Sequence, residues 1–339
     1  MALAPTRLIA LINQKGGVGK TTSAVNLGAA LALAGKRTLL VDLDPQAHLT
    51  LHVGIKYEQL DLTIYDLLTD DAVAASQVLC KVEGHDNLWV LPAHVNLAGV
   101  EAELAPKMVT GVAQRVLKKK CDALFGGGAA SFDYVIIDCP PSLGLLTINA
   151  LTLAREVIVP MQAHFLALQG LSKLLETIQL IRQSFNPDLS VAGVLLCMHE
   201  NQTLLAQEVI ADLSGFLEQA HGQDVPWRSA MVYQPPVRRN IKLAECPSFG
   251  KTIFAYEPTC HGAGDYRKLA AAVLAQGDVS RVGQVAPVIA PVGQALSLPA
   301  PTIDEQSQAP RADAPPIQTK SFAKPRAAGT RRREVVVEA

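Results

Sequence analysis

The chain has 339 residues, a formal net charge of -1 and a hydrophobic content of 49%. Such a composition is sufficient for a folded core, and it excludes a general electrostatic attraction to nucleic acid, so any such binding requires a local basic patch. It also excludes a membrane span of roughly 18–20 apolar residues, because the best candidate, 143–161, is interrupted by Arg155 and Glu156.

The first element is an apolar run at 8–12, which predicts a strand, followed by K-G-G-V-G-K-T-T at 15–22. A helix is predicted over 21–34, and Gly35 is its expected C-terminal cap. Backbone N–H groups in such a turn, together with a helix N-terminus, bind phosphates. The common nucleotide loop reads G-x-x-x-x-G-K-[ST], and Gln14 takes the position of its first glycine here.

The two lysines of this loop have different predicted roles. Lys20 is placed for the β- and γ-phosphates, and the Thr21 hydroxyl is placed for Mg²⁺. Lys15 is a second cation where the loop needs small residues, so we interpret it as a lysine that reaches the phosphates of a facing subunit. The alternative is an ordinary exposed lysine.

The next strands end in acids. The run 37–44 predicts a buried strand that ends with Asp42 and Asp44, which share a face if the strand stays regular to its end. The β-branched run 132–138 ends with Asp138, where a Walker B carboxylate holds the Mg²⁺ shell.

The rest of the chain alternates strands and helices, which predicts the α/β fold class with one doubly wound, mostly parallel sheet flanked by helices. From 278 onward no periodicity is sustained, so we expect a folded part at 1–277 and a disordered tail at 278–339. The remaining predicted strands are 87–91, 156–160, 191–198 and about 228–232, and the remaining helices are 114–125, 170–184, 204–219 and 265–276.

Four motifs carry a family resemblance. The loop at 15–22 resembles the deviant Walker A motif of the ParA/MinD class of P-loop ATPases. The segments V-D-L-D-P-Q at 41–46, D-C-P-P-S-L-G at 138–144 and N-I-K-L-A-E-C-P-S-F-G-K at 240–251 are similar to those of the ParA (Soj-like) partition ATPases. The resemblance covers about 8–275 and implies a P-loop NTPase fold, ATP and Mg²⁺ as cofactors, and slow ATP hydrolysis.

The same resemblance implies residue roles. Asp44 orients or activates the attacking water, and Asp42 lies close to the Mg²⁺ shell. Asn240 contacts the adenine base together with the residue two before it, where the family often has proline and this chain has Arg238. The predicted catalytic residues are Lys15, Lys20 and Asp44; the nucleotide-binding residues are Lys15, Gly16, Gly17, Val18, Gly19, Lys20, Thr21, Thr22, Arg238 and Asn240; and the Mg²⁺ residues are Thr21, Asp42 and Asp138.

A basic segment is the predicted DNA-binding region. Between 226 and 251 there are five basic residues and one acid, Glu245. Lys242 sits where the family has an arginine implicated in non-specific DNA binding, and we assign DNA contacts to Arg239 and Lys242. An ordinary solvated basic loop is the alternative, and Arg115 with the lysines at 118–120 is a second candidate, more simply a solvated helix face.

The function implied by the resemblance is an ATP-dependent homodimer that holds non-specific DNA of the nucleoid in the cytoplasm. A ParB-like centromere-binding protein would stimulate hydrolysis, and the cargo would be a chromosome or plasmid. Relatives position chemoreceptor clusters, carboxysomes or cellulose-synthesis machinery. A MinD-like ATPase is the nearest rival, but the tail shows no amphipathic helix, so we expect no membrane partner. The iron proteins of nitrogenase-like reductases and amidoligases or synthetases share the loop; the cysteine spacing and the 240–251 segment argue against them.

Overall fold

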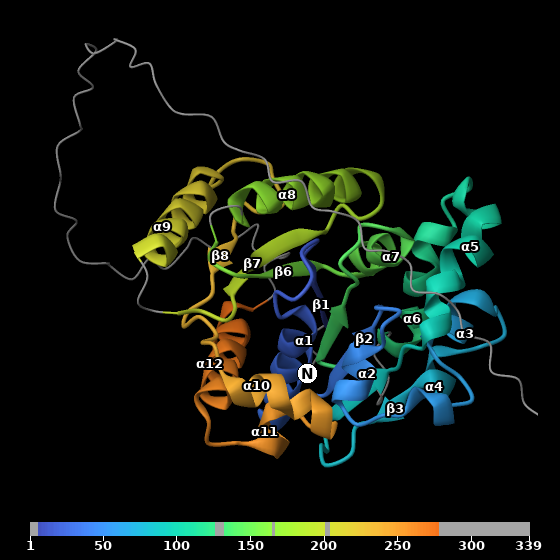
Figure 1. The fold of residues 1–339 in the computed structure, drawn as a ribbon. Helices are drawn as coiled ribbons and strands as arrows, with labels where there is room; N and C mark the ends of the chain where they lie inside the picture. Colours follow the sequence, from blue (N-terminus) through green and yellow to red (C-terminus); the bar gives the residue numbers. More distant parts are fainter. Residues whose placement is uncertain (1–5, 126–131, 165–166, 201–203, 278–339) are drawn as a thin grey trace, which may run out of the picture. The chain divides into compact units, whose positions relative to one another are not determined.

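The computed structural model describes residues 6–125, 132–164, 167–200 and 204–277; the predicted tail at 278–339 lies outside this part (Figure 1). The described residues form one eight-stranded sheet. Its strands are β1 (Arg7–Leu11), β2 (Thr38–Asp42), β3 (Cys80–Lys81), β4 (Leu88–Leu91), β5 (Tyr134–Asp138), β6 (Glu156–Met161), β7 (Ser190–Leu196) and β8 (Met231–Val232).

The order across the sheet is β3-β4-β2-β5-β1-β6-β7-β8. β3 pairs antiparallel with β4, and all other neighbouring pairs are parallel. The strands β2 to β5 lie on one side of β1, with β5 inserted between β2 and β1, and the strands β6 to β8 lie on the other side. The C-terminal end of β1 therefore lies at the point where ligands bind in doubly wound sheets. The predicted doubly wound fold is confirmed.

Helices cover both faces of this sheet (Figure 1). The face that carries α1 also carries α2, α10, α11 and α12, whereas α3 and α5–α9 pack on the opposite face. The helices are α1 (Lys20–Leu33), α2 (His48–His52), α3 (Ile64–Thr69), α4 (Ala75–Val78), α5 (Val100–Met108), α6 (Val116–Phe125), α7 (Leu145–Leu153), α8 (Ala167–Ser184), α9 (Leu204–Gln219), α10 (Ile241–Glu245), α11 (Ile253–Tyr256) and α12 (His261–Gln276).

Successive side chains along the central strands contribute alternately to the two hydrophobic cores, one on each face of the sheet. Leu8 and Leu39 pack on the face of α7 and α8, while Ile9 and Leu40 pack on the face of α1 and α12. Because successive strand residues point to opposite faces, a strand covered on both sides is apolar throughout. This explains why these strands were readable as continuous apolar runs.

Several predicted boundaries were wrong by two or more residues. The helix predicted at 170–184 begins at Ala167, and the strand predicted at 191–198 ends at Leu196. The strand predicted at 37–44 ends at Asp42, and the strand predicted at about 228–232 is the two-residue β8 (Met231–Val232). The last helix begins at His261 rather than at 265. The two-residue strand β3 was not predicted. Short edge strands depend on a neighbour for their hydrogen bonds, and nothing local in the sequence marks them.

Candidate nucleotide-binding site

The glycine-rich loop connects the end of β1 to the start of α1. Gly17 and Gly19 have φ angles of 71° and 94°, in the left-handed region that glycine adopts without strain. Asn13 fixes the loop, since its Oδ1 accepts a hydrogen bond from Lys15 N (2.9 Å) and its Nδ2 donates to Pro160 O (2.8 Å). No side chain caps the first N–H groups of α1, so the helix N-terminus is open to an anion.

The two lysines of the loop occupy different environments. Lys20 is only 7% exposed, and its Nζ donates a hydrogen bond to Lys15 O (3.2 Å). Burial lowers the pKa of Lys20, while the charges of Asp138 and Asp44 act in the opposite direction. The Lys15 side chain is exposed and makes no hydrogen bond or ion pair with the described residues. One amine is therefore held inside the loop, and the other is free outside it.

Asp138 ends β5 beside this loop. It is the register partner of Leu11 on one side and of Asp42 on the other. Both carboxylate oxygens are buried and lack a hydrogen-bond partner among the described residues. Burial raises the pKa of Asp138 well above its ordinary value, and the neighbouring Asp42 adds to this. The Thr21 hydroxyl, which lies near Asp138 without the geometry of a hydrogen bond, and the Lys20 charge act in the opposite direction. A buried carboxylate without partners suits a cation, so Thr21 and Asp138 are the residues that would hold Mg²⁺.

Asp42 differs from its neighbour because its oxygens are already used. Oδ2 accepts hydrogen bonds from Thr50 N (2.9 Å) and Thr50 Oγ1 (2.7 Å), and Oδ1 accepts one from Asp44 N (3.1 Å). Burial raises the pKa of Asp42 to about 6, and these hydrogen bonds counteract the shift. Asp42 thus lies beside Asp138, and its carboxylate anchors α2 and the Asp44 backbone.

Asp44 lies on a turn rather than on the strand. Its Oδ1 accepts a hydrogen bond from Gln46 N (3.0 Å), and Ala47 follows in the left-handed region with a φ of 51°. The expected strand alternation of Asp42 and Asp44 is therefore wrong, because the chain leaves the sheet between them. Asp44 is half-buried, and its charge acts on the Lys20 ammonium. The turn thus brings a carboxylate close to the phosphate loop.

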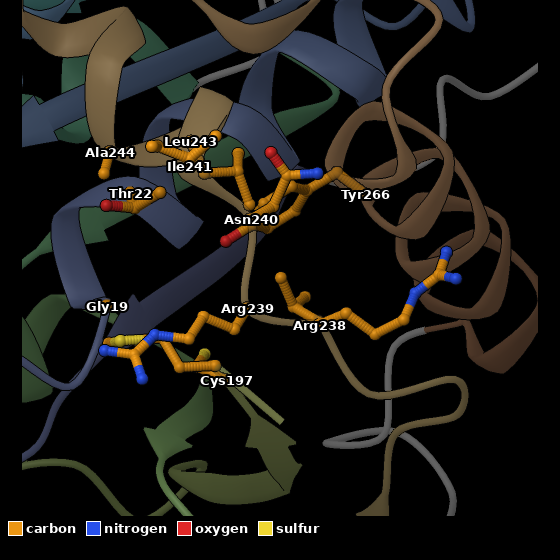
Figure 2. Close-up of a pocket in the computed structure, with 12 residues that line it drawn as sticks. Gly19, Thr22, Cys197, Arg238, Arg239, Asn240, Ile241, Leu243, Ala244 and Tyr266 are labelled. Atoms are coloured by element: carbon orange, nitrogen blue, oxygen red, sulfur yellow. The ribbon is translucent and has the colours of Figure 1, made fainter. Parts of the chain in front are cut away.

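A cavity of about 460 Å³ opens next to the loop (Figure 2). Its wall begins at Gly19 and Thr22 and continues through the residues after β7, the segment before α10, and α12. Met198 adopts a left-handed φ of 49° here, a strained conformation that is frequent at ligand sites. The apolar part of the lining is typical of a pocket for a planar organic ring; it includes Cys197, Met198, Val237, Ile241, Leu243 and Tyr266.

The two residues predicted to contact the base both border this cavity. Asn240 caps α10, because its Oδ1 accepts a hydrogen bond from Lys242 N (2.8 Å). The guanidinium of Arg238 binds the buried Asp265, with Nη2 2.6 Å from Oδ1 and Nε 3.0 Å from Oδ2. Figure 2 shows this guanidinium turned away from Gly19 and Thr22.

The positive charge of the predicted basic segment is partly neutralised in the folded protein by acidic side chains. Besides Arg238, two more of its five basic residues have acidic partners: Arg239 Nη1 lies 2.9 Å from Glu200 Oε1, and Lys242 Nζ lies 2.9 Å from Glu245 Oε2. Asp265 and Glu200 come from outside 226–251, so counting charges along the segment could not reveal them.

Sequence reasoning missed part of the pocket. Cys197 and Met198 follow β7, and the rule that ligands bind beyond strand C-termini pointed to that position. Tyr266 comes from α12, and no sequence signal marked it. Its hydroxyl forms a 3.0 Å hydrogen bond with Ser23 Oγ, which links α12 to α1 beneath the cavity.

Comparison with known proteins identifies relatives of this chain. A family model described as an AAA domain matches residues 6–191. The chain is 44% identical over 271 residues to the sporulation initiation inhibitor protein Soj of Bacillus subtilis, covering 80% of this chain and 99% of that protein. It is 41% identical over 277 residues to the chromosome partitioning protein ParA of Caulobacter vibrioides, covering 81% and 97%.

The chain belongs to the ParA/Soj family of P-loop ATPases. The predicted family membership is thus confirmed. Within the described residues, every helix is too short or too polar to cross a membrane.

Solved structures give the same fold. The cobyrinic acid a,c-diamide synthase structure from Mycobacterium smegmatis, with an ATP analogue and magnesium, matches with a TM-score of 0.66 and 36% identity over 81% of this chain and 97% of that one. MinD of Pyrococcus horikoshii with Mg-ADP matches with a TM-score of 0.57 at 24% identity, over 79% and 95% of the two chains, and supports the fold alone. ATP and Mg²⁺, the cofactors expected for a ParA/Soj chain, agree with these ligands.

Proposed function

We propose that this ParA/Soj chain is an ATP-dependent dimerising switch that binds non-specific DNA and partitions a chromosome or plasmid. The observation that carries the proposal is the separation of the two loop lysines. Lys20 is buried in its own loop, whereas Lys15 is exposed at the rim without a partner among the described residues. An unpaired lysine beside a phosphate site suits the phosphates of a second protomer, because a point charge needs no special geometry.

Residue positions support ATP hydrolysis at this site, and the family resemblance implies that it is slow. When bound, ATP with Mg²⁺ would provide the phosphoryl group for attack by water, and the protein would contribute positioning and charge neutralisation. Lys20 and the N-terminus of α1 would neutralise the phosphates, and Thr21 and Asp138 would hold the metal. Asp44 would orient the attacking water, and its backbone N–H is fixed by a hydrogen bond to the buried Asp42.

Lys15→Ala should leave ATP affinity within about threefold of wild type and abolish ATP-dependent dimers, because the lost amine is exposed and serves the facing protomer. Asp44→Ala should have the opposite phenotype, a dimer that forms with ATP and persists. Light scattering after size exclusion, with and without ATP, measures both variants. ATP-dependent dimers of the Lys15→Ala protein would contradict the role of that lysine.

The DNA-binding part of the proposal rests on Lys242 of α10. Its ammonium lies 2.9 Å from Glu245 Oε2 and 5.8 Å from the centre of the Tyr256 ring, and Tyr256 Oη donates to the same Glu245 oxygen (2.9 Å). To bind DNA, the half-buried Lys242 must give up its ion pair with Glu245 and contact a DNA phosphate instead. We place the protein on the nucleoid in the cytoplasm, with a ParB-like partner stimulating hydrolysis.

Lys242→Ala should weaken DNA retention at low salt without changing nucleotide affinity, because phosphate contacts act through charge alone. The slope of log affinity against log salt should fall by about one per protomer. Glu245→Gln is the matched control: it frees Lys242 and should strengthen retention. Gel-shift titrations across salt concentrations test both, and an unchanged slope for Lys242→Ala would remove this residue from the interface.

The similarity to the Mycobacterium diamide synthase structure supports a second candidate, an ATP-dependent amide synthase. The more similar relatives are named Soj and ParA, so partitioning is preferred. Incubation with ATP, glutamine and a corrinoid carboxylate should yield no amide, whereas DNA pull-down should depend on ATP. The reverse pair of results would favour the synthase. Liposome sedimentation with ATP tests the MinD-like alternative, for which we expect no pelleting.

A further inference from the structure

Arg239 lies on the cavity side of the segment before α10. This segment runs beside the end of β7, since His199 N donates to Val237 O (3.0 Å) and Arg239 N donates to His199 O (3.2 Å). Strand-like pairing of this kind sends successive side chains to opposite sides. Arg238 points to Asp265 on α12, so Arg239 points the other way, and Figure 2 shows its side chain extending toward the part of the cavity lining that includes Gly19 and Cys197.

The side chain of Arg239 is held only weakly. It is 73% exposed, and its ion pair is with Glu200, which is 58% exposed. Exposed pairs of this kind contribute little, because solvent screens them and two long side chains lose freedom. Arg238, in contrast, pairs with the buried carboxylate of Asp265, which would lose both guanidinium contacts and keep only the Arg238 backbone N–H (3.1 Å) among its described partners if the side chain moved. Of these two neighbouring arginines, Arg239 is the one available to a ligand.

The geometry points to Arg239 as a nucleotide-binding residue, with its planar guanidinium covering the base in the 460 Å³ cavity. This inference rests on the proposed ATP site, and it replaces the DNA contact expected for Arg239. A guanidinium stacks on aromatic rings through cation–π attraction. The opposite wall offers apolar side chains such as Leu243 and Tyr266, so a planar ring would lie between an apolar surface and a cation.

The test separates the base from the phosphates. Calorimetric titrations with Mg²⁺ would compare a non-hydrolysable ATP analogue with inorganic tripolyphosphate, on wild type, Arg239→Ala and Arg228→Ala. Arg228 is exposed and does not line this cavity, so its variant controls for the loss of one positive charge. We expect Arg239→Ala to weaken analogue binding about three- to tenfold, with tripolyphosphate within about twofold of wild type and Arg228→Ala unchanged for both ligands.

Two results would overturn the inference. Unchanged analogue affinity in Arg239→Ala would show that this arginine does not touch the nucleotide, and equal losses for both ligands would assign it to the phosphates. If the wild-type protein binds neither ligand, both the proposed function and this inference are rejected. If wild type binds the analogue and only the Arg239 prediction fails, the proposed function stands.

Discussion

Lys20→Ala should lower ATP affinity by about a hundredfold, the largest nucleotide effect expected of a single substitution in this chain. Lys20 is buried in the loop beside Asp138 and Asp44, and its ammonium is the group placed for the β- and γ-phosphates. Charge-assisted hydrogen bonds are about twice as strong as neutral ones, so their loss costs about 1.5–3 kcal/mol. Equilibrium titration with a fluorescent ATP analogue measures the change.

Lys15→Ala is the matched control for Lys20→Ala, because it removes the same group from the same loop but from an exposed position. Its affinity should stay within about threefold of wild type. If Lys20→Ala binds as well as Lys15→Ala, Lys20 does not contact the phosphates and the loop works differently from other P-loops.

Asp138→Asn should stabilise the metal-free protein and abolish the effect of Mg²⁺ on ATP affinity. The two buried oxygens of Asp138 lack partners among the described residues, and an unsatisfied buried group costs about 1–3 kcal/mol, more when it is charged. The free energy of unfolding in urea, measured with EDTA, should therefore rise in the variant. Titration of ATP with and without Mg²⁺ should give equal affinities.

The gain in stability expected for Asp138→Asn should increase with pH. The pKa of Asp138 is raised in the folded state, so wild type loses stability as pH rises above the ordinary range of an aspartate. The variant lacks this contribution and keeps only the smaller one from Asp42, whose pKa is also raised. The stability gap should widen with increasing pH. Asp42→Asn is the control, since that carboxylate accepts three hydrogen bonds and its replacement should destabilise. Destabilisation by both substitutions would show that Asp138 has hidden partners.

The sequence predicted most of the fold because its central strands are covered on both faces. Continuous apolar runs such as Tyr134–Asp138 are readable without knowing their neighbours. The phosphate loop was equally readable, since a strand, a glycine-rich turn and a helix follow each other directly. The two edge strands, β3 and β8, depend on pairing across the sheet, and their bounds could not be derived from local pattern.

The ion pairs and hydrogen bonds between side chains could not be predicted from the sequence. Arg238 binds Asp265 and Arg239 binds Glu200, and both acids lie outside the predicted basic segment. The motif placed Asp42 near the metal, but its hydrogen bonds with Thr50 depend on where the chain turns after β2. The family resemblance supplied residue roles, and only the folded arrangement separates the carboxylate without partners from the one already bonded.

The margins of the sheet restrict how two copies can meet. β3 and β8, the outermost strands, have two residues each, so each margin offers very few free backbone groups to an approaching strand. The short edge strands disfavour the pairing of two copies into one continuous sheet. They also disfavour growth into a fibre by addition of strands at the edge. Self-association is left to faces built from loops and helices, and the rim that carries Lys15 is one of them.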